Sequence, residues 1–297
     1  MSVSVGTDAA PQPRVRARSQ RLLVTLLGEY WSEPGTPIPS ATLVSLLGEF
    51  GIAPANARAA LARLARRGLL ERSRNGRRTY YDLTPEAVAV LERGAQRIFG
   101  LGRRGASWDG RWTVVIFSVP DAERDLRHLV RSRLRWLTFS PLYDAVWVSP
   151  HADPDDVLHL LDQLGLTDVL VMRTSDVSFR EGSSQRLEQA WDLAALAERY
   201  ETFLSRFRPL VERAGRDRID AAEALVGRTE MVDEWRGIAR DDPDLPAQFL
   251  PEHFPRAEAN EVFMQAYEAL KAPARERFEE LVAGSADESG SASTASA

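Results

Sequence analysis

The sequence predicts an α+β protein built from three successive blocks, each indicated by its own pattern. Residues 51–81 read as a short helix of alanine, leucine and arginine, followed by a hairpin around Asn75-Gly76. Residues 108–180 alternate apolar strands with amphipathic helices, and residues 185–283 are helical in periodicity. These patterns predict an N-terminal winged helix-turn-helix, a central ferredoxin-like α+β domain and a C-terminal helical domain.

We place the three predicted domains at residues 14–104, 105–180 and 181–283. Residues 1–13 are small, polar and proline-containing, and residues 284–297 carry too little apolar area to order. Both ends are therefore predicted to be disordered tails.

The composition narrows the class of protein further. The 297 residues include no cysteine, which excludes disulfides and thiolate metal sites. No apolar run approaches the ~20 residues needed to span a bilayer, and no signal-peptide core is present. We expect a cytoplasmic protein.

Local signals define the elements of the first block. Apolar residues predict an opening helix that ends near Trp31 and a second helix capped by Ser40. Pro54 suits the first turn of the third helix, and Gly68 suits its left-handed end. The third helix has a buried stripe made by Ala57, Ala60, Leu61 and Leu64.

A hairpin and a further helix complete this block. Asn75-Gly76 favours a tight turn because both residues tolerate positive φ. Thr79, Tyr80 and Tyr81 suit the returning strand. Thr84 then reads as the N-cap of a helix that runs to about residue 98.

Charge sets the first block apart from the rest of the chain. Residues 14–104 contain sixteen arginines and seven acidic residues, a formal net charge of +9, whereas the whole chain carries −5. Arginine is the common cation throughout, since the chain has a single lysine, and many charged runs are merely solvated. The local excess nevertheless indicates that this end attracts DNA.

The recognition helix and the hairpin, or wing, supply the candidate DNA-binding residues. Arginine can bond guanine and asparagine can bond adenine in bidentate fashion, whereas wing arginines more often touch phosphates. The candidates are Asn56, Arg58, Arg63, Arg66, Arg74, Arg77 and Arg78. Alternatively, Asn56 bonds the local backbone and Arg63 faces solvent or a phosphate. Arg14, Arg16 and Arg18 either follow the DNA backbone as an arm or stay unbound.

The central block is predicted to have the order β-α-β-α-β. Its strands are expected at residues 112–119, 143–148 and 168–173. Asp121 is expected to cap the first helix, and Asp153-Pro154 to open the second.

Three stretches, in this order, identify a family. They are residues 58–70 with 77–84, residues 112–120 with 139–150, and Glu234-Trp235-Arg236 with Asp242-Pro243-Asp244-Leu245-Pro246 and Leu250-Pro251. With them the chain resembles the phenylacetate-degradation repressors, the PaaX-like transcriptional regulators, over about residues 18–283. One departure is that family members often have glycine where Thr138 and Ala145 stand.

The resemblance implies a dimeric repressor of a catabolic operon. It implies binding to a palindromic operator and release by an aryl- or acyl-CoA effector such as phenylacetyl-CoA. The sequence itself predicts no cofactor and no membrane partner. An alternative is a DNA-binding regulator controlled by a protein partner without a small ligand.

Candidate effector residues lie in the central block. Arg127, Arg131 and Arg135 share a helix face and suit the phosphates of coenzyme A, and Trp136, Tyr143 and Trp147 offer aromatic area. The plainer interpretation, which we favour, is a solvated arginine face and aromatic core residues.

An enzyme is the remote alternative. The central block is similar to a small CRISPR-associated nuclease subunit, which holds a metal ion with an aspartate at the end of its first strand. Here residues 116–120 contain no carboxylate, and the four histidines lack zinc-ligand spacing. We predict no catalytic residues, no metal site and no enzymatic activity.

Overall fold

The computed structural model describes residues 12–31, 35–102, 108–176, 190–216 and 218–291, with side chains for 15–284 within these ranges. The chain forms two compact units. Unit 1 takes in the described residues of 1–96, 207–234 and 263–297, and unit 2 those of 97–206 and 235–262. Four helices contribute residues to both units: α4 (Pro85–Gly100), α9 (Leu193–Ala214), α10 (Ala221–Asp241) and α11 (Arg256–Ala269).

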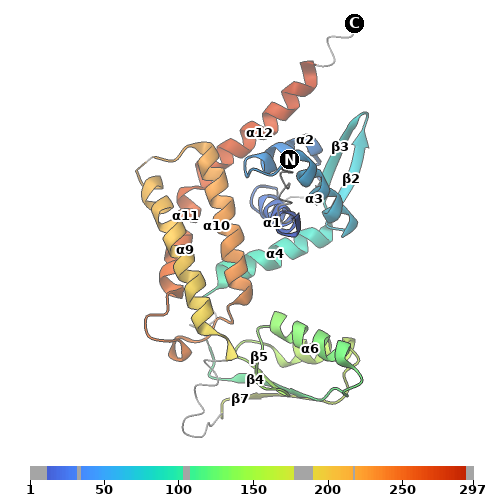
Figure 1. Cartoon of the computed structure of the whole chain (residues 1–297), viewed down its shortest axis with the longest axis vertical. Helices are drawn as coiled ribbons and strands as arrows, with labels where there is room; N and C mark the ends of the chain where they lie inside the picture. The colour runs from blue at the N-terminus through green and yellow to red at the C-terminus, as the bar shows by residue number, and fades with distance from the viewer. Residues whose placement is uncertain (1–11, 32–34, 103–107, 177–189, 217, 292–297) are drawn as a thin grey trace, which may run out of the picture. The chain divides into compact units, whose positions relative to one another are not determined.

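Unit 1 contains the predicted winged helix-turn-helix, coloured blue to cyan in Figure 1. Its elements before α4 are α1 (Gln12–Tyr30), β1 (Ile38–Pro39), α2 (Ser40–Gly48), α3 (Pro54–Arg66), β2 (Leu70–Asn75) and β3 (Arg78–Leu83). The strands form an antiparallel sheet of order β1-β3-β2. Leu23, Leu47 and Leu61 are fully buried between the first three helices, so the apolar periodicity correctly marked the core.

The helix ends in unit 1 follow most of the sequence signals. Gly68 has φ +72°, and the amides of Gly68 and Leu69 bond the carbonyls of Ala65 and Leu64 at 3.0 Å each, closing α3 with a Schellman motif. Thr84 caps α4, since its hydroxyl accepts from the Ala87 amide at 3.1 Å. The expected Ser40 cap is wrong, because Pro39 holds the N-cap position of α2.

The hairpin turn lies one residue later than expected. Asn75 pairs with Arg78, so the two-residue loop is Gly76-Arg77. Of these residues Gly76 alone takes positive φ, at +58°. A glycine in the first loop position suits a tight two-residue turn that continues the twist of both strands.

The C-terminal helices also belong to unit 1. α12 (Lys271–Ser291) continues past residue 284, where the sequence predicts the start of a tail, while residues 1–11 and 292–297 lie outside the described ranges. Arg228 of α10 pairs with Glu29 of α1 at 2.5 Å, and these two side chains are 3% and 11% exposed. The Arg228 guanidinium also lies 4.0 Å from the centre of the Tyr267 ring. A buried ion pair therefore joins the first helix of the chain to its C-terminal part.

Unit 2 contains a four-stranded antiparallel sheet of order β5-β6-β4-β7. The elements run β4 (Trp112–Phe117), α6 (Arg124–Trp136), β5 (Ser140–Tyr143), β6 (Val146–Ser149), α7 (Pro154–Gln163) and β7 (Val169–Thr174). This β-α-β-β-α-β order is ferredoxin-like, as predicted. The second expected strand is in fact a hairpin, because the chain turns at Asp144-Ala145 between β5 and β6.

One face of this sheet carries the core of the central domain. Val115, Phe117 and Trp147 point to the same side and pack with Val130 and Leu134 of α6, which lies over that face in Figure 1. Val157 and Leu161 of α7 complete the cluster. The expected Asp121 cap is wrong, since Glu123 holds the N-cap position of α6.

Thr138 follows α6 in the left-handed region, with φ +67°. Its amide bonds the Arg135 carbonyl at 3.0 Å, and the Phe139 amide bonds the Leu134 carbonyl at 2.9 Å. This Schellman geometry favours glycine. Here the Thr138 hydroxyl contacts that of Ser149 at 3.1 Å, an interaction glycine lacks.

The helical part of unit 2 packs around Trp235, which is fully buried. Its ring lies 5.1 Å from Phe203 and 5.9 Å from Tyr200, and its indole N–H donates to the Ile98 carbonyl at 3.2 Å. A short 3-10 helix, η1 (Ala247–Phe249), follows the turn after α10.

No helix within the described ranges is long and apolar enough to cross a membrane.

Candidate nucleic-acid interface

α3 separates its buried and exposed residues cleanly. Ala57, Ala60 and Leu61 are fully buried against the rest of the winged helix. Arg58 and Arg66 are exposed on the opposite side, two helical turns apart. Two of the predicted base-reading or phosphate-binding arginines therefore stand on the free face of the predicted recognition helix.

Asn56 and Arg63 lie on the flank of α3 and are only half exposed. The Nε and one terminal nitrogen of Arg63 are buried, and neither has a hydrogen-bond partner among the described residues. Arg63 is thus less available to a ligand on the free face than Arg58.

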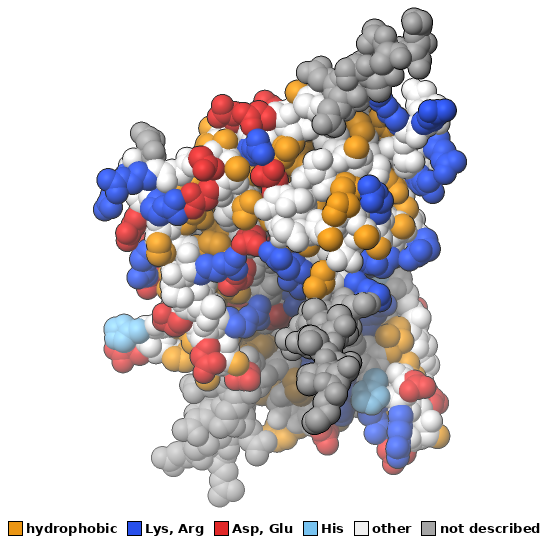
Figure 2. Space-filling model, turned by 45° about the horizontal axis from the view of Figure 1, so that its top comes forward, with side chains coloured by type: hydrophobic (Ala, Val, Ile, Leu, Met, Phe, Trp, Pro, Cys, Tyr) orange, Lys and Arg blue, Asp and Glu red, His pale blue; other side chains and the backbone are white. Residues whose placement is uncertain are grey.

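The wing carries arginines on both faces and at its tip. Arg74 stands opposite Thr79 and Arg72 opposite Tyr81 in the hairpin register, so both point to the same side of the sheet. Arg78 points to the other side and Arg77 occupies the loop. All four side chains are exposed, and basic side chains gather at the upper right of Figure 2, over the wing.

Arg72 was missed by the sequence reasoning. Its exposed side chain shares a face with Arg74, and the alternation of arginines two residues apart along a strand was the available signal. Arg67, also exposed, adds a further positive charge directly after α3.

The predicted N-terminal arm is engaged within unit 1. Arg18 pairs with Glu230 at 2.7 Å and also donates to the Phe50 carbonyl at 3.4 Å. Arg21 pairs with Asp233 at 3.2 Å. Arg18 therefore ties α1 to α10, and the side chain of Arg14 lies outside the described residues. The expectation that Arg18 belongs to a free arm is wrong.

The candidate effector arginines on α6 have partners in their own domain. Arg127 donates to the Val119 carbonyl at 2.6 Å and to Asp121 at 2.9 Å. Arg131 lies 3.9 Å from Asp144, and Arg135 lies over the Trp147 ring at 5.3 Å. These contacts favour the plainer interpretation of this face.

The candidate effector aromatics separate into two groups. Trp147 is 1% exposed and belongs to the core, whereas Trp136 and Tyr143 are 60% and 51% exposed. The structure therefore does not bring the three rings together as the walls of one pocket.

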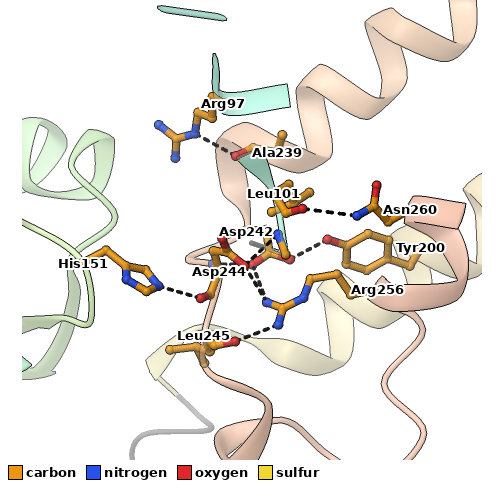
Figure 3. A network of polar contacts seen from close by, with 11 residues as sticks. Arg97, Leu101, His151, Tyr200, Ala239, Asp242, Asp244, Leu245, Arg256 and Asn260 are labelled. Carbon is orange, nitrogen blue, oxygen red and sulfur yellow. Dashed lines mark hydrogen bonds and ion pairs between the residues drawn. The ribbon is translucent and has the colours of Figure 1, made fainter. Parts of the chain in front are cut away.

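A buried polar network organises the turn between α10 and α11 (Figure 3). Asp242 accepts hydrogen bonds from the Tyr200 hydroxyl at 2.5 Å and from the Asp244 amide at 2.6 Å. Arg256 lies 3.2 Å from the Asp244 carboxylate and 3.6 Å from that of Asp242. His151 is half-buried and contacts the Asp244 carbonyl through Nε2 at 2.8 Å.

Burial dominates the titration of this network. It raises the pKa of Asp242, although the Arg256 charge and the Tyr200 hydrogen bond oppose the shift. Burial and the neighbouring Asp242 carboxylate raise the pKa of Tyr200, which stays protonated as a donor. The turn after α10 is held by two carboxylates that share one guanidinium.

The stretch after β4 holds no carboxylate before Asp121. β4 ends at Phe117, and the first carboxylate after it, Asp121, is exposed and pairs with Arg127. No group of three or more histidine, aspartate or glutamate side chains within the described ranges is arranged to hold a metal ion.

Three family models match the chain in order. The PaaX-like protein model matches residues 16–87, the PaaX protein central Cas2-like domain matches 105–189, and the PaaX-like protein C-terminal domain matches 191–280.

Two individual proteins are similar to this chain. The chain is 28% identical over 262 residues to the transcriptional repressor PaaX of Escherichia coli, covering 86% of this chain and 81% of that protein. It shares its fold with an uncharacterised protein of Mycobacterium tuberculosis of known structure, with a TM-score of 0.57 and 24% identity over 89% of this chain and 99% of that chain. The winged helix, the central sheet and the C-terminal helices, matched in this order, show that the chain belongs to the PaaX-like family.

Proposed function

We propose that this protein is a transcriptional repressor that binds double-stranded DNA through α3 and the wing. The observation that carries the proposal is the set of exposed arginines on the free face of α3 and along the wing. A helix fits the major groove with its N-terminal residues nearest the bases, while wing arginines reach phosphates. The similarity to a transcriptional repressor supports this assignment.

The Arg58→Ala variant is expected to weaken operator binding about 10- to 100-fold and to relax the preference for one base pair, because an arginine–guanine contact contributes about 1–3 kcal/mol. Operator affinity is measured by fluorescence anisotropy on sequences recovered by selection from random DNA. Arg93→Ala, an exposed arginine of α4, is the matched control. Equal losses in both variants would contradict base reading by Arg58.

The Arg77→Ala variant is expected to weaken binding to all sequences alike, because the loop arginine faces the phosphate backbone. Removing one phosphate contact should lower the slope of log affinity against log salt by about one unit. The measurement is a salt titration on operator and random duplexes. An unchanged slope would remove the wing tip from the DNA surface.

A homodimer on a palindromic operator is the second part of the proposal. In unit 2, the sheet face that points away from the core carries six aliphatic side chains: Val114, Ile116, Val146, Val148, Leu170 and Met172. Val114 and Val148 are already buried within the chain, whereas Leu170 and Met172 are 52% and 37% exposed, so the free part of this face lies at β7. An apolar face of this kind favours pairing with a second copy of itself.

Leu170→Asp is therefore expected to convert the dimer to a monomer at micromolar concentration, because a carboxylate at the apolar contact is desolvated without a partner. Leu158→Asp is the control, since Leu158 is similarly exposed but lies on α7, across the core from that face. Analytical ultracentrifugation measures whether each variant is a dimer or a monomer. A Leu170→Asp dimer as tight as the original would place the dimer contact elsewhere.

The third part is release by an aryl- or acyl-CoA thioester, which would couple repression to the breakdown of phenylacetic acid or a related acid. Such an effector must bind the DNA-incompetent state more tightly, or it shifts no population. The test measures operator affinity with and without phenylacetyl-CoA. If no thioester loosens the complex, control by a protein partner becomes the better hypothesis.

A further inference from the structure

A pocket of about 440 Å³ opens in unit 1 between the C-terminal end of α1 and the middle of α12. This volume lies within the range of small-molecule sites. The proposed DNA-binding function makes no use of it, and the candidate effector residues of α6 do not line it.

Aromatic rings form one wall of this pocket. Tyr30 and Phe278 stack with ring centres 5.0 Å apart and an interplanar angle of 15°. Trp31 meets Phe278 edge-on at 6.0 Å, and its indole N–H donates to the Thr36 carbonyl at 2.8 Å. Tyr30 and Phe278 are 7% and 4% exposed, so close packing with their neighbours holds both rings in place. Preformed aromatic surface lowers the entropy lost when a flat ligand binds.

Carboxylates complete the lining. Glu29 lies at the inner end, where its pair with buried Arg228 holds it in place. Glu279 lies at the outer end and pairs with Arg275 at 2.9 Å, with both side chains more than half exposed. A surface pair of this kind contributes little and is easily exchanged.

These features select the charge of a ligand. The faces of aromatic rings carry negative potential and attract cations. Arg228 neutralises Glu29, so Glu279 is the carboxylate that adds to this preference, because its exposed pair with Arg275 is easily exchanged. A carboxylate at this position disfavours the phosphates of coenzyme A. We propose that this pocket binds a small aromatic ligand with a protonated amine, whose ring lies against Trp31 and Phe278 and whose ammonium group replaces Arg275 beside Glu279.

The test uses the full-length protein and three probes that share one ring: tryptamine, indole and indole-3-acetate. Binding is followed by NMR of the tryptophan indole N–H groups, with the Trp31 signal assigned by its loss in Trp31→Phe. Tryptamine is expected to shift this signal with a Kd of about 0.1–1 mM, near the ligand efficiency of compounds of this size. It should bind at least about fivefold more tightly than indole-3-acetate, and Glu279→Gln should reduce that ratio.

Ala283→Trp should weaken tryptamine binding at least about tenfold, because Ala283 lines the pocket at an exposed position and the larger side chain fills it without disturbing the core. Trp136→Ala, which removes an exposed tryptophan outside the pocket, should leave binding unchanged. The site is refuted if no probe shifts the Trp31 signal, or if Ala283→Trp binds as the original does. Tighter binding of indole-3-acetate than of tryptamine refutes the ligand class. None of these measurements depends on DNA binding. They therefore test the ligand pocket independently of the proposed DNA-binding function.

Discussion

Replacing Arg256 with methionine is expected to lower the free energy of unfolding by about 3–5 kcal/mol at pH 7. The substitution leaves the Asp242 and Asp244 carboxylates, 3% and 6% exposed, without their shared guanidinium. It also removes the hydrogen bond from Arg256 to the Leu245 carbonyl. Methionine keeps most of the side-chain volume. The fall in the free energy of unfolding is therefore caused by loss of the guanidinium charge and not by a cavity.

The pH dependence of the Arg256→Met deficit follows from the direction of the Asp242 shift. Burial raises the pKa of Asp242 in the folded protein. Between its ordinary pKa and this raised value, the folded state holds a proton that the unfolded state has released, so stability falls as pH rises. Removing Arg256 takes away an interaction that lowers this pKa, so the deficit should be larger at pH 7 than at pH 5.

Urea unfolding at both pH values tests this prediction. Arg240→Met is the control, because Arg240 lies near the same turn but pairs with Asp241 at the surface and should contribute under about 1 kcal/mol. A deficit equal to that of the control, or one that grows on acidification, would contradict the role given to Arg256.

Replacing Arg228 with methionine should destabilise unit 1 by a similar amount, about 3–5 kcal/mol. Glu29, whose side chain is 11% exposed, is left without its partner, and the contacts of the guanidinium with the Tyr267 ring and carbonyl are lost. Adding Glu29→Gln to Arg228→Met should recover much of the loss, because a neutral amide is far less costly to bury than a carboxylate.

Thermal and urea unfolding of the single and double variants test the Arg228 prediction. Arg18→Met is the matched control, since Arg18 also joins α1 to α10 but its side chain is 45% exposed, and it should cost about 1 kcal/mol or less. If the double variant is no more stable than Arg228→Met, the unpaired charge of Glu29 is not the cause of the loss.

The Arg228 pair also bears on how DNA binding is studied. A fragment of residues 1–104 leaves Glu29, Arg18 and Arg21 without Arg228, Glu230 and Asp233. Such a fragment carries an unpaired buried carboxylate, so failure of the fragment to bind DNA would reflect its instability. Tests of the winged helix therefore require the full chain.

Local signals predicted much of the fold. Gly68 and Thr84 act within one or two turns of their own helix ends, so their roles are readable from neighbouring residues. The turn at Asp144-Ala145 carries no glycine or proline, so the apolar run from Tyr143 to Val148 read as one strand instead of part of a hairpin. The central domain was nevertheless correctly identified, because predicting the hairpin as a single strand does not change the alternation of strands and helices around it.

The candidate DNA surface was predicted in outline and corrected in detail. Helical spacing placed Arg58 and Arg66 on the free face of α3, and alternation along the wing would also have revealed Arg72. The role of Arg18 depended on Glu230, which lies 212 residues away in the sequence. Helical and strand periodicity carries no information about an ion-pair partner so far away in the sequence.

By itself, the sequence determined the family, the kinds of element in each block and the concentration of positive charge at the N-terminal end, because these depend on residue type and short-range spacing. The tertiary structure alone decided that α1 shares a compact unit with the C-terminal helices, that Trp147 is core while Trp136 is exposed, and that residues of α1 and α12 line an open pocket. These outcomes depend on which distant surfaces exclude water from one another, and that is settled only when the whole chain packs.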